Sequence, residues 1–141
     1  MMAEKEITIK NQLTQIAVIA DTLESLSDEW NVPMSVILSL NLVLEELVSN
    51  IIFYGYDDTN EHIIQIYLSL NREIIQMRIE DDGKAFNPLL FTEPDIGLAV
   101  EDRKIGGLGI HFVRNIMDNL SYERLNNKNI LSMSKNIHLT E

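Results

Sequence analysis

The order of apolar patterns along the chain predicts an α+β fold, a two-layer sandwich in which helices cover one face of a mixed, mostly antiparallel sheet. Apolar residues recur at helical spacing in three segments and alternate in five others. Four of the alternating segments form two pairs joined by short turns. Paired strands, with the helices grouped elsewhere in the chain, are typical of an antiparallel sheet that is covered on one side.

The first part of the chain is predicted to form one strand and two helices. Residues 4–10 alternate weakly and form the strand, and Asn11 is expected to cap a helix that runs to about residue 30. Pro33 favours the first turn of a second helix over about residues 33–53. Apolar side chains at i, i+3, i+4 and i+7 mark its buried face. They are Ile37, Leu40, Leu44, Leu47, Val48 and Ile51.

The second part is predicted to form two hairpins with a loop and a helix between them. Residues 62–70 and 74–80 alternate and are joined by a short connection, which predicts a hairpin. Residues 84–106 lack a regular pattern, and a stretch of this length in a compact domain is typically a functional lid or a disordered segment. Gly106 opens a helix to about residue 119, and residues 121–125 and 130–135 are expected to form the second hairpin.

Length and composition narrow the class of protein. The 141 residues fit one domain spanning 1–141, and the absence of Cys excludes disulfides, thiolate metal sites and cysteine nucleophiles. The net charge is −11, with no Lys or Arg between Asn11 and Asn71, which disfavours nucleic acid and anionic membranes as partners. No apolar run reaches the ~18 residues of a membrane span and the start lacks a secretory core, so a cytoplasmic location is expected.

Glu46 and Asn50 are the first candidate functional pair. They lie four residues apart on the second helix, so their side chains share one face at the edge of the apolar stripe. An asparagine oxygen can bind Mg²⁺, and a nearby carboxylate can orient or deprotonate a nucleophile. Glu45 lies about as far from the stripe on its other side, but its neighbour one turn on is Ser49. The alternative interpretation is a pair of solvated surface residues.

Two glycine-containing segments carry the other candidates. Asp81 ends a predicted strand, where it can accept a hydrogen bond from an exocyclic amine, and Gly83 allows close backbone approach to a base. The alternative there is an ordinary tight turn. Residues 106–109, Gly-Gly-Leu-Gly, open a helix whose N–H groups and dipole favour an anion, and Lys104 or Arg103 would add charge-assisted contacts. The alternative there is a flexible hinge.

Taken in order, these groups resemble the N box and the two glycine boxes of the GHKL ATPase superfamily. The segments LEELVSNIIFYGY, IEDDGKAFNP and RKIGGLGIHFVRNIMDNLSYER are similar to its branch of bacterial anti-sigma-factor serine/threonine-protein kinases. The resemblance covers about residues 40–135. It implies the Bergerat, or histidine-kinase-like ATPase, fold, with ATP or ADP and Mg²⁺ held between sheet and helices under a lid at about residues 84–106.

The resemblance also implies residue roles. Glu46 matches the glutamate that assists phosphoryl transfer, Asn50 matches the Mg²⁺-binding asparagine, and Asp81 matches the aspartate that reads the adenine amino group. The other expected nucleotide-binding positions are Gly83, Phe86, Lys104, Gly107, Leu108 and Gly109.

The chain departs from the family pattern at three places. Tyr54 stands where many relatives carry a histidine, so no role of that histidine is transferred. The hydroxyl that relatives place near adenine on a late strand has Ser132 as its nearest candidate. The first predicted helix lacks the arginine that some relatives direct at their protein substrate.

The implied function is an ATP- and Mg²⁺-dependent serine/threonine kinase that phosphorylates a small anti-anti-sigma-like protein. It would change partners with nucleotide state, a sigma factor being the second partner, and a homodimer is among the expected assemblies. One alternative is a non-catalytic, nucleotide-dependent anti-sigma binding switch. Another, disfavoured by the lack of a pair of dimerisation helices, is a detached histidine kinase catalytic domain.

Overall fold

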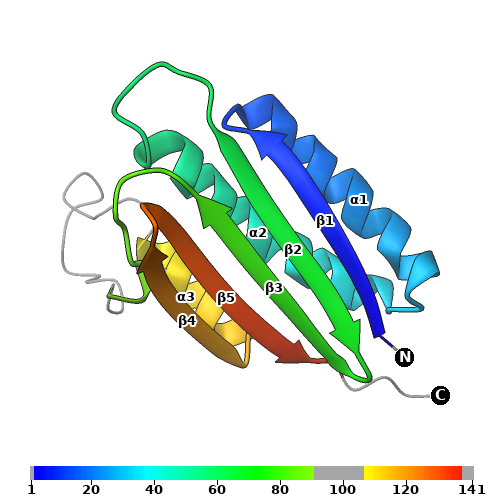
Figure 1. Cartoon of the computed structure of the whole chain (residues 1–141). Coiled ribbons are helices and arrows are strands. Elements are labelled where there is room, and N and C mark those ends of the chain that lie inside the picture. Colours follow the sequence, from blue (N-terminus) through cyan, green and yellow to red (C-terminus); the bar gives the residue numbers. More distant parts are fainter. Residues whose placement is uncertain (1, 91–106, 138–141) are drawn as a thin grey trace.

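The computed structural model of the chain describes residues 2–90 and 107–137, which build one sheet with helices on one face (Figure 1). The sheet has five strands in the order β1-β2-β3-β5-β4. The strands are β1 (Met2–Lys10), β2 (Ile63–Asn71), β3 (Ile74–Asp81), β4 (Asn119–Leu125) and β5 (Lys128–Asn136). The α+β prediction is confirmed, and each strand pair of the described part is antiparallel, where a mixed sheet was expected.

The predicted helices are present with shifted ends. They are α1 (Ile16–Glu29), α2 (Met34–Tyr54) and α3 (Gly107–Ile116), and short 3-10 turns occupy Leu13–Gln15 and Pro88–Leu90. The prediction that Asn11 caps the first helix is wrong. Its Oδ1 accepts a hydrogen bond from the backbone N–H of His62 at 2.8 Å, and its own N–H donates to the His62 carbonyl at 3.0 Å. Asn11 therefore extends the contact between β1 and the start of β2.

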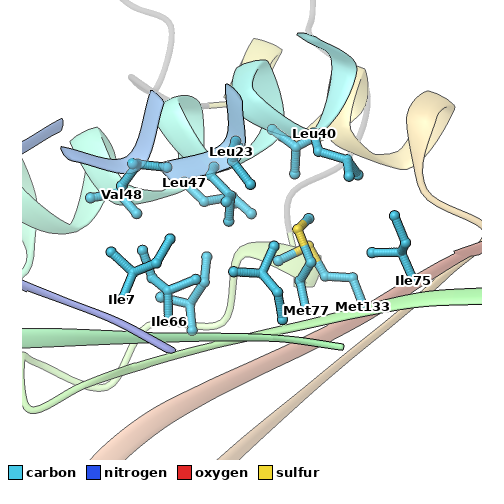
Figure 2. Packing of buried hydrophobic residues seen from close by; sticks show 14 of the residues in the cluster. Ile7, Leu23, Leu40, Leu47, Val48, Ile66, Ile75, Met77 and Met133 are labelled. Carbon is cyan, nitrogen blue, oxygen red and sulfur yellow. The ribbon is translucent and has the colours of Figure 1, made fainter. Parts of the chain in front are cut away.

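The core lies between the sheet and the helices, and Figure 2 shows apolar side chains from both layers pointing toward each other. Alternate residues of β2 and β3 are buried, among them Ile66 and Met77, and α1 and α2 meet them with residues such as Leu23 and Leu44. Because side chains alternate across a strand, the same strands present polar residues on the uncovered face. There the Arg78 guanidinium lies 4.2 Å from the centre of the Tyr67 ring.

Helix α2 is the central helix of this layer. Its residues Ile37, Leu40, Val43, Leu44, Leu47 and Val48 are buried, which agrees with the predicted stripe, and Ile51 is partly buried. By length and composition alone, α2 is also the one helix among the described residues that is apolar enough to cross a membrane. A core helix passes the same test, and α2 packs against both α1 and α3 here.

Candidate functional site

A cavity of about 100 Å³ opens between α2 and one end of the sheet. Its walls come from α2, the end of β3 with the loop that follows it, α3, and the β4–β5 hairpin. Three of the residues predicted from the sequence line this cavity: Asn50, Asp81 and Phe86. The other lining residues are Leu47, Ile51, Tyr54, Gly55, Ile79, Lys84, Pro88, Ile110, Tyr122, Asn129 and Leu131. Most of the wall is apolar, with a few polar groups, as in sites that bind small organic molecules.

Asp81 is the buried carboxylate of the cavity, with only 5% of its surface exposed. Its Oδ1 accepts hydrogen bonds from the Gly83 backbone N–H and from Asn129 Nδ2, both at 2.9 Å. Burial is the main cause that raises the pKa of Asp81, with a smaller contribution from the charge of Asp82. The two hydrogen bonds and the guanidinium of Arg124 act in the opposite direction. Among the described residues both hydrogen bonds go to Oδ1, so Oδ2 is left for a ligand.

Asn129 is a polar residue of the site that sequence reasoning missed. It is 6% exposed, and the β3–β5 register places it opposite Asp81. Tyr122 donates its hydroxyl hydrogen to Asn129 Oδ1 at 2.5 Å, so a second side chain of the hairpin joins the network. The turn residues Asn126 and Asn127 both have positive φ, 53° and 61°, which is typical of the tight turn of a two-residue hairpin. That turn fixes the register that brings Asn129 to the cavity.

Ser132 does not lie at this cavity. It pairs with Arg78 across β3 and β5 and lines the polar groove on the uncovered face of the sheet. Successive residues of a strand point to opposite faces, and Asn129 and Ser132 are three positions apart, so only one of them can face the helices. Asn129 is the one that does.

Glu46 and Asn50 meet on α2 as their spacing predicts, with Asn50 Nδ2 donating to Glu46 Oε1 at 3.2 Å. Glu46 is half-buried whereas Glu45 is exposed, which separates the two glutamates that the sequence left open. The Glu46 carboxylate lies against the Cα of Gly109 in the first turn of α3, since a Cβ built on Gly109 would overlap it. The part of α2 that carries Glu46 and Asn50 is therefore in direct contact with the glycine segment at the start of α3.

The backbone of the cavity rim is closely packed at Gly55 and Gly83. The Lys84 N–H donates to the Gly55 carbonyl at 2.7 Å, and a Cβ on Gly83 would lie 2.6 Å from that same oxygen. Such a contact requires glycine at position 83. The hydrogen bond from Lys84 to Gly55 joins the end of α2 to the loop after β3. Tyr54, the departure noted in the sequence, lines the cavity beside this contact.

A second cluster of side chains surrounds His62. Its Nε2 is 2.7 Å from Asp58 Oδ1 and its Nδ1 is 3.0 Å from Asp82 Oδ1, while the ring stacks on Tyr56 with centroids 4.2 Å apart. The hydrogen bond with Asp58 is the largest cause that raises the pKa of His62, and the same bond lowers the pKa of Asp58. Burial raises the pKa of the Tyr56 hydroxyl well above its usual range, so it stays neutral.

Of the remaining predicted positions, Gly107, Leu108 and Gly109 form the first turn of α3, so the glycine segment does open a helix. Lys104, with most of the segment expected to act as a lid, falls within 91–106, outside the described residues. The described residues contain no cluster of three or more His, Asp or Glu that would hold a metal by itself. Asn50 fits a different kind of site, because Mg²⁺ bound with phosphates needs only one or two protein oxygens. Its amide nitrogen is used by Glu46, which leaves the oxygen for a cation.

Comparison with known proteins decides the family. The model of the family described as "Histidine kinase-like ATPase domain" matches residues 9–135. The chain belongs to this family. It is 26% identical to the serine/threonine-protein kinase BtrW of Bordetella bronchiseptica over 110 residues, which cover 78% of this chain and 76% of that protein. It is also 26% identical to the anti-sigma F factor of Bacillus subtilis over 109 residues, covering 72% and 70% of the two chains.

Two solved structures of histidine kinases share the fold. The blue-light activated histidine kinase of Erythrobacter litoralis EL346 superposes with a TM-score of 0.56 at 14% identity, covering 88% of this chain. This chain spans only 41% of the length of that kinase. The Acinetobacter baumannii histidine kinase AdeS gives a TM-score of 0.53 at 13% identity and covers 94% of this chain and 68% of AdeS. An ATPase domain implies nucleotide binding. The curated relatives are named a serine/threonine-protein kinase and an anti-sigma F factor.

Proposed function

We propose that the protein is a cytoplasmic regulatory kinase that binds ATP with Mg²⁺ and phosphorylates a serine or threonine of a small anti-anti-sigma-like protein. The observation that carries the proposal is that Asp81 lines one cavity together with Asn50 of α2 and Ile110 of α3. Beside these two residues, Glu46 of α2 contacts Gly109 of α3. The names of the curated relatives, a serine/threonine-protein kinase and an anti-sigma F factor, support the reaction class and the kind of partner.

Each residue has a task that its position allows. Asp81 Oδ2 accepts a hydrogen bond from the amino group of adenine inside the apolar cavity. Asn50 Oδ1 would hold the cation, and the N–H groups of the first turn of α3 would bind phosphate, which the helix dipole favours. When bound, Mg²⁺ would neutralise charge on the transferred phosphate.

Glu46 is the residue proposed to orient the serine or threonine hydroxyl of the protein substrate. Its carboxylate is half-buried, is held by Asn50 and lies at the N-terminal turn of α3, next to the proposed phosphate site. A carboxylate placed there can orient the serine or threonine hydroxyl and accept its proton as the phosphoryl group is transferred. Gly109 leaves the space in which this carboxylate sits.

The proposal is tested by incubating the protein with γ-labelled ATP, Mg²⁺ and the small protein that co-purifies with it. Acid-stable label on a serine or threonine of that protein supports the kinase, whereas an acid-labile phosphohistidine contradicts it. Asn50→Ala is the metal control, and it should lose Mg²⁺-dependent nucleotide binding and transfer together. Nucleotide binding without any phosphoryl transfer would favour the alternative, a non-catalytic anti-sigma switch. The name of several relatives, anti-sigma F factor, supports this alternative.

Assembly is part of the same proposal. Partner exchange with nucleotide state requires that both the small protein and a sigma factor bind the chain, alone or as a homodimer. Size-exclusion chromatography with light scattering, with and without ATP and ADP, measures these complexes directly. A chain that forms the same complexes in all three conditions would contradict the nucleotide switch.

A further inference from the structure

The β4–β5 hairpin holds the loop after β3 through bonds from its side chains to the loop backbone. Arg124 Nη1 donates to the Gly83 carbonyl at 2.8 Å, and Asn129 Nδ2 donates to the Lys84 carbonyl at 2.7 Å. The Phe86 N–H donates to Asn129 Oδ1 at 3.1 Å. This loop carries the cavity residues that follow Asp81, so the hairpin sets the shape of this side of the cavity.

The backbone of the loop fixes which way the Asn129 amide faces. A backbone N–H can only donate and a carbonyl can only accept, so Phe86 requires the amide oxygen and Lys84 requires the amide nitrogen at their respective positions. Tyr122 adds a second donor to the oxygen. With this orientation the remaining N–H of Asn129 points at Asp81 Oδ1. All four hydrogen-bonding positions of Asn129 are then used within the protein.

Asp81 Oδ1 is thereby held as an acceptor from two sides, by Asn129 and by the Gly83 N–H. A proton on the carboxyl group has to sit on Oδ2, the oxygen left for the ligand. Ionised, Oδ2 accepts a hydrogen bond; protonated, it donates one. Ionised Asp81 therefore matches a base that presents an amino group to Oδ2, whereas protonated Asp81 matches a base that presents a carbonyl group.

We propose that Asn129 is the positioning residue for base selection, because it keeps Asp81 Oδ1 an acceptor and so leaves Oδ2 alone to distinguish 6-aminopurine from 6-oxopurine nucleotides. This proposal rests on the proposed nucleotide binding. Burial already raises the pKa of Asp81, and Asn129 is the largest influence that lowers it. The other groups facing Asp81 are Asp82, which raises its pKa, Arg124, which lowers it, and the neutral Tyr56. The Lys84 ammonium is paired with Asp57 at 3.0 Å.

The experiment measures the affinities of ADP and IDP by calorimetry for the parent, Asn129→Ala and Asn129→Asp between pH 5 and 8. IDP has a carbonyl where ADP has the amino group, so the ratio of the two affinities reports the state of Oδ2. The parent should prefer ADP, and the preference should fall as the pH is lowered. Asn129→Ala should lose about 10-fold or more in ADP affinity where Asp81 becomes protonated, because the charge-assisted bond from the adenine amino group to Oδ2 is then lost, and much less in IDP affinity.

Both Asn129 variants should lose the preference at a higher pH than the parent. Asn129→Asp keeps the shape but removes both N–H donors and adds a like charge beside Asp81, so it should shift the pH dependence further than alanine does. Ser132→Ala, on the same strand but the other face, is the matched control and should behave as the parent. Tyr122→Phe, which keeps the aromatic ring and the Phe86 bond, should show the same change to a smaller extent, and it serves if Asn129→Ala fails to fold.

An Asn129→Ala variant that loses ADP and IDP affinity equally, with the pH dependence of the parent, would overturn the proposal and leave Asn129 a purely structural residue. Unchanged ADP affinity in that variant would overturn it as well. A parent chain that binds neither nucleotide would instead refute the proposed function on which this inference rests.

Discussion

Replacing Gly109 by alanine should separate folding stability from phosphoryl transfer. Position 109 is in the first turn of α3, and alanine is favoured over glycine within a helix by about 0.5–1 kcal/mol. The new Cβ would overlap the Glu46 side chain at Oε1, Cδ and Cγ, so this flexible side chain has to swing away from α3 as a whole. The free energy of unfolding should therefore stay within about 1 kcal/mol of the parent value.

Transfer should respond differently, because the carboxylate that moves is the one proposed to orient the hydroxyl. A displacement of about 1 Å at a catalytic group costs on the order of 10²-fold in rate. Gly109→Ala should then bind ATP within a few fold of the parent while its transfer rate falls by about 10²-fold. Urea denaturation, calorimetry and single-turnover transfer with labelled ATP measure the three quantities.

Asn115→Ala is the matched control for this variant. Asn115 is an exposed residue of the same helix, so replacing it by alanine raises the helix propensity in a similar way without affecting Glu46. A Gly109→Ala protein that transfers phosphate at the parent rate would show that the position of Glu46 is not decisive. A loss of several kcal/mol in stability would show that the carboxylate cannot move aside, which would refute the structural reasoning.

Three further outcomes are expected. Asp81→Ala should weaken ATP binding by on the order of 10–150-fold, measured by calorimetry, since a bond to a charged group is lost; parent-like binding would exclude Asp81 from base recognition. Glu46→Ala should bind ATP within a few fold but transfer about 10²–10⁴-fold more slowly in the labelled-ATP assay, with the exposed Glu45→Ala as the unaffected control. The hydrogen bond to Asp58 raises the pKa of His62 above its usual 6.5. The contribution of protonated His62 to the stability of the fold is therefore complete below pH 6.5, and it is lost as the pH rises through the pKa that His62 has in the folded protein. The urea concentration at the midpoint of unfolding should fall with rising pH in the parent, and it should fall less in His62→Gln. The same pH dependence in both proteins would contradict a stabilising role of protonated His62.

The sequence predicted those parts of the fold and site that depend on local spacing. The buried stripe of α2 follows the helical period, and the contact between Glu46 and Asn50 follows from their separation of one turn. Asp81 was found because an aspartate at the end of an apolar strand, two residues before a glycine, is a local pattern. Local patterns of this kind persist because helix and strand geometry fix the neighbours that a side chain meets.

The parts that were missed depend on pairing between distant segments. Asn129 reaches Asp81 only because β5 pairs with β3 in one register, and a shift of one residue would have turned Ser132 to the cavity side instead. The signal was present in the double asparagine turn that sets this register, but its meaning requires knowing which strand lies alongside. Asn11 was assigned to a helix cap for the same reason, because its partner, His62, lies at the start of a distant strand.

The order of strands in the sheet also has a consequence for synthesis of the chain on the ribosome. The cavity takes its inner polar wall from Asp81 in β3 and Asn129 in β5, and roughly fifty residues must be closed into a loop before these two meet. Chains emerge from the N-terminal end, so β1, the two long helices and the β2–β3 hairpin are available early. A nascent chain that ends before β5 therefore lacks Asn129 and Leu131 of the cavity wall. If this cavity is the nucleotide site, as we propose, nucleotide would stabilise the domain only once residues 128–136 have joined the sheet.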